Sequence, residues 1–431
     1  MQYILDRNTP PLASPLNNIK LPTYQKSHLS NGIPVYTLTY GSAEVVQVQM
    51  VFKAGSSLQS KVGIATYMAS HMQEGTQSYS SLQLAQKLDE FGAWIEHEVG
   101  ESYLSLNLTT LSTHIAQTLP LLHEVVCAPS FPEHEFDQMK ARNLQKLKVN
   151  AQKTSYQARR DFGHYMYGAA HPYGRHLGEE ELASLSLESI KAYHHQYIYP
   201  ENSFIIVVGQ FDQAEMMKEL NELFSSYTAR SVTKETSRVL TASIKSQNGR
   251  RYKEMEGLQA TIRLGHLGFR RSHPDYYPMQ VVNTILGGYF GSRLMKNIRE
   301  EKGYTYGIYS GWISYKYSGV FVVQGDIGNK YIEDTISEVK KEIHRLMEEP
   351  VPANELELVK NYLLGKNINQ RETPFQLADL IRFSVVNDIS FTEIDQKFDI
   401  IQGIKADEIL ALAQKHFKPT QLLEVVCGKR L

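Results

Sequence analysis

The strongest constraint on the fold is an internal repeat. One pattern, with residues spaced by ten and then nine positions, occurs twice: Ile190, Pro200 and Gly209, then Ile409, Pro419 and Gly428. A second pattern also occurs twice: Pro132, Glu135 and Lys140, then Pro352, Glu355 and Lys360. The copies are offset by 219 residues (409 − 190) in the first pattern and by 220 (352 − 132) in the second. Two separate patterns at nearly one offset indicate a duplicated chain whose halves share one fold.

The halves have the same coarse order of predicted elements. A strand-like stretch opens each half, at 45–52 and 260–267, and a short buried strand follows the last proline of each. Between them, alternating strands precede long amphipathic helices such as 331–348. Strands and helices in separate blocks favour an α+β fold with mostly antiparallel sheets. The polar segment 229–250 reads as a linker, so we predict domains at 1–228 and 251–431.

Composition excludes several classes of protein. Lys plus Arg (45) nearly equals Asp plus Glu (46), which argues against a nucleic-acid-binding protein. The net charge does not show how the charges are distributed, however, so the composition does not exclude a chamber with a local excess of charge. The two cysteines, Cys127 and Cys427, are too few for a disulfide framework and are expected to be buried thiols. Without an apolar run long enough to span a bilayer or a recognisable signal peptide, we expect a cytoplasmic protein.

The segment with the most specific motif reads Gly63-Ile-Ala-Thr-Tyr-Met-Ala-Ser-His-Met-Gln-Glu-Gly-Thr76. It resembles the pitrilysin/insulinase family of zinc peptidases, whose members carry Gly-Leu-Ala-His-x-x-Glu-His-x-x-x-x-Gly-Thr at this place. His171-Pro-Tyr-Gly174 is similar to a second signature of that family, and residues 287–306 are similar to a third. The resemblance extends over residues 25–430. It implies the LuxS/processing-peptidase-like metallohydrolase fold.

The family's zinc chemistry depends on helix geometry. Two His at i and i+4 bind one metal from the same helix face, and the Glu beside them activates the metal-bound water. Thr66, Ala69 and Ser70 occupy these three positions here. The family's third ligand is a Glu on a later helix, and the matching stretch, 143–148, has no carboxylate. The resemblance therefore implies that no cofactor and no metal bind to this chain.

The second-half signature keeps its functional groups. Arg299 and Tyr306 occupy the positions of the family's Arg/Tyr pair, which in relatives reaches the substrate held at the zinc. An arginine offers a charged donor fork to a peptide carbonyl, and a tyrosine hydroxyl can stabilise a developing oxyanion. We take both as catalytic residues that act in trans. The alternative is an ordinary helix-surface arginine and strand tyrosine.

Other candidate residues have structural explanations. His71 has no partner at metal-ligand spacing and is expected to pack or lie on a helix surface. His194 and His195 lie at a predicted helix end, where imidazole suits the helix dipole. His97 is expected to face away from its strand neighbours, with a weaker possibility that this strand contacts substrate. The glycines around Gly287 lack the Gly-Lys-Ser/Thr ending of a phosphate loop, so close backbone packing explains them better.

The resemblance implies a division of labour between two chains. Some members of the family are split into one chain with the zinc motif and one with only the Arg/Tyr pair, and this sequence is similar to the second kind. The expected function is a metal-free subunit of a heterodimeric zinc peptidase that acts on short or unfolded peptides, with zinc in the homologous partner.

Other functions compete with this interpretation. A structural protein of the same fold, like the core subunits of respiratory complexes, is the main alternative, and a peptidase that works unaided is a third. A homodimer is expected when the partner is missing. No nucleic acid and no membrane is expected as a partner.

Overall fold

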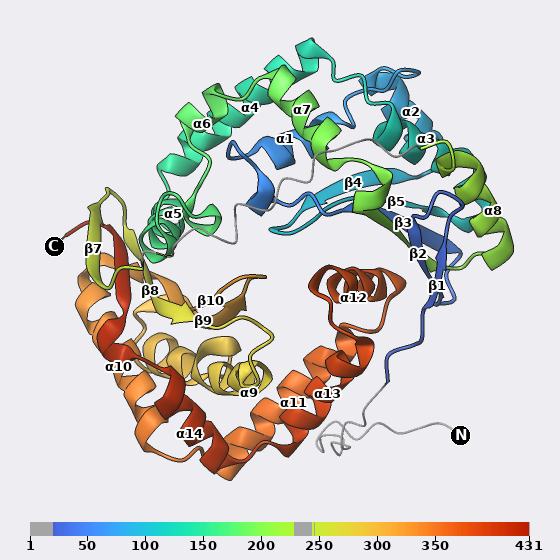
Figure 1. Ribbon diagram of the computed structural model, residues 1–431. Coiled ribbons are helices and arrows are strands. Elements are labelled where there is room, and N and C mark those ends of the chain that lie inside the picture. Colours follow the sequence, from blue (N-terminus) through green and yellow to red (C-terminus); the bar gives the residue numbers. More distant parts are fainter. Residues whose placement is uncertain (1–19, 228–243, 245, 431) are drawn as a thin grey trace, which may run out of the picture.

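The computed structural model describes residues 20–227, 244 and 246–430. Figure 1 shows two β-sheets on opposite sides of the molecule's middle, with most helices outside them. Most of the predicted linker 229–250 lies outside the described residues, and strand β7 already begins at Gly249. None of the described helices is long and apolar enough to cross a membrane.

The first half builds one sheet and its covering helices. Its described strands are β1 (Gln25–His28), β2 (Pro34–Thr39), β3 (Val45–Phe52), β4 (Trp94–Val99), β5 (Leu104–Leu111) and β6 (Ser203–Gly209). Its described α-helices are α1 (Ile64–His71), α2 (Ser81–Glu90), α3 (Ile115–Cys127), α4 (Glu133–Ala151), α5 (Thr154–Tyr167), α6 (Glu179–Ala183), α7 (Leu187–Tyr197) and α8 (Gln213–Phe224).

The second half repeats this plan. Its described strands are β7 (Gly249–Glu254), β8 (Gln259–Gly268), β9 (Thr305–Ser314), β10 (Gly319–Gly328) and β11 (Leu423–Gly428). Its described α-helices are α9 (Tyr276–Asn283), α10 (Ile332–Glu348), α11 (Ala353–Asn369), α12 (Pro374–Asn387), α13 (Phe391–Gly403) and α14 (Ala406–His416). Two π-helical segments, Thr284–Gly288 and Met295–Glu301, follow α9.

Sheet topology confirms the predicted α+β fold and its duplication. The strand orders are β1-β2-β6-β3-β5-β4 and β7-β11-β8-β10-β9, which match position by position once β1 is set aside. In each sheet the closing strand, β6 or β11, runs parallel to one neighbour and antiparallel to the other. The remaining pairs of described strands are antiparallel.

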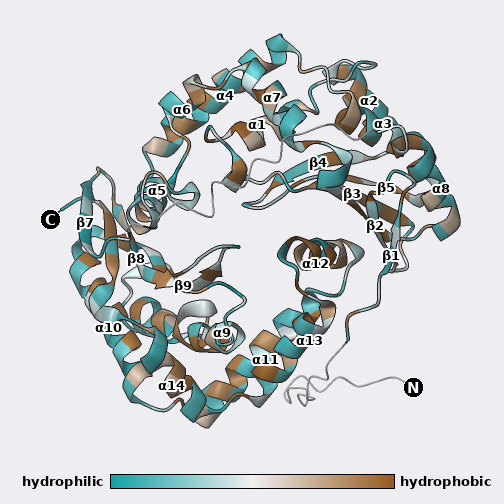
Figure 2. Ribbon diagram, in the orientation of Figure 1, coloured by the Kyte–Doolittle hydropathy of each residue, from teal (hydrophilic) through white to brown (hydrophobic). Residues whose placement is uncertain are grey.

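Helical periodicity explains how the outer layers form. In α10, Ile332, Ile336, Val339 and Ile343 recur on one face, and all four are buried against the second sheet's core. Figure 2 shows hydrophilic colour on much of the outer ring of helices and hydrophobic colour in the sheets. The predicted helix 331–348 is therefore confirmed, with its first residue in a preceding turn.

The two halves exchange one helix each. Helix α5 of the first half packs on β8 and β11 of the second sheet, and α12 of the second half packs on β3 and β6 of the first sheet (Figure 1). The two helices begin 220 residues apart (374 − 154), so they occupy equivalent positions in the repeat. Each half thus covers part of its neighbour's sheet.

Candidate functional site

A cavity of about 780 Å³, here called the central cavity, lies between the halves. Its first wall comes from α1, α4, α5 and the turn 172–177, and its second wall comes from β8, β9, β10 and the turn after β9. The helix that resembles the zinc motif and the sheet of the opposite half therefore border the same space.

The start of α1 is fixed by a glycine. Gly63 caps the helix with a φ of 91°, a left-handed backbone conformation that residues other than glycine rarely adopt. A Cβ there would also meet the Leu177 side chain at 2.9 Å. The helix that follows exposes Thr66 to the central cavity, half-buries Ser70 and buries Ala69 completely.

The stretch predicted to match the third ligand, 143–148, borders the same cavity. Asn143 of α4 lines it together with Thr66, and the Asn143 Nδ2 donates a hydrogen bond to the Met139 carbonyl at 2.8 Å. Threonine, alanine, serine and asparagine are not the His, Cys and carboxylate ligands that zinc takes. Over residues 20–227, 244 and 246–430, no group of three or more His, Cys, Asp or Glu side chains could hold a metal ion. The donor set at this site does not suit zinc.

The His-Pro-Tyr-Gly motif forms a joint between the halves. His171 Nδ1 accepts a hydrogen bond from the Tyr173 backbone N–H at 3.1 Å, which fixes the turn. Gly174 approaches so closely that a Cβ would lie 2.2 Å from the Gly168 carbonyl oxygen. The Tyr173 ring then stacks on Tyr315 of the second half, with ring centroids 4.5 Å apart. The motif therefore holds one cavity wall against the other.

Positive charge gathers around the central cavity. The lining includes four arginines and one carboxylate: Arg159, Arg160, Arg175, Arg263 and Glu101. The arginines come from a helix, a turn and a strand. The first and the last of them are 104 positions apart in the chain (263 − 159). The sequence did not exclude a charged chamber, but it could not identify these residues, because only Arg159 and Arg160 are neighbours in the chain.

Arg299 and Tyr306 lie outside the lining of the central cavity. Arg299 belongs to the π-helical segment Met295–Glu301, and its Cζ lies 4.3 Å from the centre of the Phe290 ring. Tyr306 and Gly307 together oppose the single residue Asp326, which makes a β-bulge in β9. A bulge re-aims side chains, and Tyr306 is 89% exposed. The tyrosine hydroxyl is therefore open to a ligand or partner.

The histidines singled out from the sequence do not meet at one site. His71 is completely buried between two phenylalanine rings, and burial lowers its pKa. His97 Nδ1 lies 2.8 Å from Gln73 Nε2, on the face of β4 opposite to its exposed glutamates. His194 is buried and His195 is exposed, so they point to different environments. The packing interpretation of His71 agrees with this geometry.

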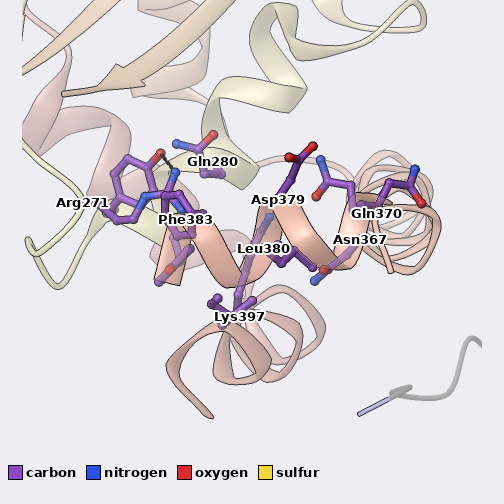
Figure 3. A pocket seen from close by; sticks show the side chains of 12 residues that line it. Arg271, Gln280, Asn367, Gln370, Asp379, Leu380, Phe383 and Lys397 are labelled. Carbon is purple, nitrogen blue, oxygen red and sulfur yellow. Dashed lines mark hydrogen bonds between the residues drawn. The ribbon is translucent and has the colours of Figure 1, made fainter. Parts of the chain in front are cut away.

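A second cavity of about 550 Å³, here called the α12 cavity, lies where α9, α11, α12 and α13 meet. Figure 3 shows Arg271 beside Phe383 of α12, with Lys397 reaching up from α13. The Arg271 Cζ lies 4.2 Å from the centre of the Phe383 ring. Burial lowers the pKa of Lys397 to about 8, and nearby positive charges add to this effect. This cavity is separate from the zinc-motif helix.

Two family models match the chain. The model of insulinase, peptidase family M16, matches residues 35–179, and the model of the peptidase M16 inactive domain matches residues 184–363. A Bacillus subtilis protein named "Uncharacterized zinc protease YmxG" is 27% identical over 310 residues, which are 70% of this chain and 73% of that protein. A Helicobacter pylori protein named "Non-peptidase homolog YmxG" is 25% identical over 369 residues, or 83% and 80% of the two chains.

Solved structures share the fold. The crystal structure of a peptidase M16 inactive domain from Pseudomonas fluorescens has a TM-score of 0.85 at 22% identity, and the match covers 95% of this chain and 98% of that one. A chain of complex III from Candida albicans has a TM-score of 0.75 at 15% identity, with 94% and 95% covered. At these sequence identities, the similarity establishes a shared fold and nothing more.

Proposed function

Since this chain belongs to the M16 peptidase family, we propose that it is the metal-free subunit of a two-chain zinc peptidase that acts on short or unfolded peptides. A homologous partner with a His-x-x-Glu-His motif would supply the metal, its water and the general base. This chain would supply one side of the chamber together with Arg299 and Tyr306. The cytoplasm is the proposed compartment.

One observation carries this proposal: the cavity persists although the ligands at its zinc-motif helix are gone. Thr66 and Asn143 still face one cavity of about 780 Å³, while no carboxylate or imidazole stands at the motif positions. A cavity of this size, lined by tyrosines and charged groups, has the dimensions of a ligand pocket.

The exposure of Tyr306 supports a role in trans. The bulge in β9 leaves its ring almost wholly open, so the hydroxyl can reach a substrate bound to another chain. Arg299 holds its guanidinium over the exposed Phe290 ring, which restricts its position without using its N–H donors on a carboxylate. In the proposed complex, these donors bind the peptide and the hydroxyl stabilises the oxyanion.

Peptide cleavage by the reconstituted pair tests the proposal. Tyr306→Phe removes one hydroxyl and should lower kcat about 10²–10³-fold, the usual effect of losing one oxyanion donor. Arg299→Ala should lower kcat/KM while the pair still elutes as a complex in gel filtration. Tyr331→Phe is the matched control, because Tyr331 is half-buried and stacks on Tyr304 just before α10, whereas Tyr306 is 89% exposed. Full activity of both test variants would reject the assignment.

A structural role remains the second candidate function. The similarity of fold to a chain of complex III favours this alternative. It assumes no peptidase activity for this protein. Under this alternative, the chain still binds a partner, but neither Arg299 nor Tyr306 affects any activity of the complex. Sedimentation of the chain with and without a zinc-motif homologue tests both the peptidase role and the structural role, because both require a partner. A stable monomer in every mixture would contradict both roles.

A further inference from the structure

The arginines of the central cavity lack acidic partners within the described residues. The Cζ of Arg263, on β8, lies 5.4 Å from the centre of the Phe162 ring. The Nε atoms of Arg160, Arg175 and Arg263 are all buried without a hydrogen-bond partner. Arg175 uses its other nitrogens on backbone carbonyls, with Nη2 3.1 Å from the Gln59 oxygen. Buried donors left unsatisfied cost free energy, so these three point to a missing acceptor.

The single carboxylate of the cavity does not balance this charge. Glu101 accepts a hydrogen bond from Ser56 at 3.2 Å, and burial raises its pKa although Arg159 opposes that effect. Burial also lowers the pKa of Arg263 to about 10, helped by the positive charge of Arg159. Four guanidinium groups against one carboxyl leave an excess of positive charge around this cavity. A zinc ion would be repelled here.

The other lining residues describe the shape of a suitable ligand. Tyr167, Tyr173 and Tyr315 line the cavity and pack against one another as an aromatic cluster. Such rings can cover an extended peptide, while guanidinium forks bind carboxylate oxygens in pairs. A volume of about 780 Å³ is enough for a few peptide residues.

We propose that the central cavity binds the carboxylates of peptides through Arg160, Arg263 and their neighbours, and so selects acidic peptide segments. The selection of substrates rests on the proposed function, but the binding itself does not.

The test uses the full chain alone and fluorescent peptides at low salt. The probe is an N-acetylated, C-amidated peptide rich in Glu, and its match replaces every Glu by Gln. We expect the acidic peptide to bind at least 10-fold more tightly, with affinity falling as salt rises. A third peptide, neutral but with a free C-terminal carboxylate, distinguishes a terminal carboxylate from side-chain carboxylates, and tight binding of either source supports the proposal.

Arginine variants locate the binding. Arg263→Gln and Arg160→Gln should each weaken the acidic peptide about 10-fold, in proportion to the loss of one charge-assisted contact. Arg142→Gln is the matched control, because Arg142 lies exposed on α4 outside the cavity lining. The thermal unfolding midpoint of each variant shows that it is folded. Binding of the Glu peptide and of the free-carboxylate peptide no tighter than that of the amidated Gln peptide would overturn the proposal. An equal loss in Arg142→Gln would also overturn it.

The outcomes separate this inference from the proposed function. If the chain binds acidic peptides as expected but the reconstituted pair cleaves nothing, the binding site stands and the peptidase role fails. If the pair cleaves Glu and Gln peptides equally and Arg263→Gln changes neither, the peptidase role stands and the acidic site fails.

Discussion

At the scale of single residues, Ala69 shows how a catalytic site is lost while its frame remains. Its side chain is completely buried at the position where the resemblance places a general base. Restoring a carboxylate there would place a charge in the core, which is costly without a partner. Thr66 and Ser70 stand four positions apart on the accessible side of the same helix, so they alone could be changed without disturbing the core.

Zinc content tests this loss directly. The purified chain, after dialysis, should hold well under one zinc per chain by elemental analysis, because zinc sites use about three or four strong ligands. The double variant Thr66→His with Ser70→His creates an i, i+4 pair and should bind measurably more zinc. A stoichiometric metal in the natural chain that disappears in Thr66→Ala would contradict the expectation.

Lys397 of the α12 cavity predicts a pH effect on stability. Its pKa falls from 10.5 to about 8, first through burial and then through Arg271, Lys366 and Arg371. Asp379 borders the same cavity but pairs with Arg382 at 2.9 Å. Below pH 8 the folded and unfolded chains both hold the proton, so the buried charge exerts its full cost. Between pH 8 and 10.5 the unfolded chain binds more protons, so the Lys397 contribution to stability rises with pH.

The variant Lys397→Met should therefore unfold at a higher temperature than the natural chain at pH 7, with a gain on the order of 2 kcal/mol. The difference in Tm should shrink as the pH rises from 8 toward 10.5. The exposed control Lys218→Met, whose partner Glu222 is also exposed, should leave Tm almost unchanged at every pH. A gain for Lys397→Met that stays constant with pH would show that the lost charge is not its cause.

Sequence reasoning reached some of these residues and missed others. Thr66, Ala69 and Ser70 could be placed because the segment 63–76 resembles the family's zinc motif and aligns with it residue by residue. Arg263 could not, because it meets Arg159 and Arg160 only after two sheets and an exchanged helix have formed. Arg299 and Tyr306 were identified by their position in a motif, and their chemistry in a complex stays a prediction.

At the scale of elements, the packing of α12 on the other half's sheet is a finding that the sequence did not predict. The spacing of apolar residues and the internal duplication predict where many helices and strands lie. The strand Val45–Phe52, for example, forms as predicted. Nothing local says that α12 packs on the other half's sheet. Its Leu377, Ala378 and Ile381 are completely buried there, beside Ile206 and Val208 of β6.

A polar cluster also ties α12 to the first sheet. Arg382 is buried and forms ion pairs with Glu98 of β4 at 2.7 Å and with Asp379 at 2.9 Å. The same guanidinium lies over the Tyr103 ring, 4.8 Å from its centre, and that tyrosine's hydroxyl bonds to Glu98. Arg382 is the buried charge of this cluster, and a shift of the helix that separated it from Glu98 would remove one of its partners.

Leu377→Ala tests the contribution of this contact. Removing a completely buried leucine should destabilise the protein by about 2–5 kcal/mol, since a cavity remains. Hydrogen exchange should show lost protection in β6 and β3, although the substitution lies in the other half of the chain. Leu358→Ala, at a leucine 54% exposed on α11, should change stability by less than about 0.5 kcal/mol. Loss of protection confined to residues 246–430 would contradict the exchanged packing.

At the scale of the whole molecule, the exchange of α5 and α12 makes the two halves depend on one another. The sequence predicts two domains, 1–228 and 251–431. Each sheet has a cluster of buried apolar residues on its outer side. The inner faces differ, because their apolar residues are covered by a helix from the opposite half. Gly265 illustrates the fit, since a Cβ there would lie 2.9 Å from the tip of the Phe162 ring of α5.

This dependence predicts how the chain behaves when it is cut. A protease site inserted in the segment 229–250 should allow cleavage into two pieces that still elute together in gel filtration, because α5 and α12 stay buried in each other's halves. Expressed alone, residues 1–228 would leave the apolar residues of β3 and β6 uncovered, and exposed patches of this kind favour aggregation. We expect each piece alone to aggregate or bind a hydrophobic dye, and co-expression to restore a soluble pair. The Leu377→Ala variant should weaken the cut pair more than Leu358→Ala does. A first half that is monodisperse and unfolds cooperatively by itself would show that α12 is dispensable for its sheet.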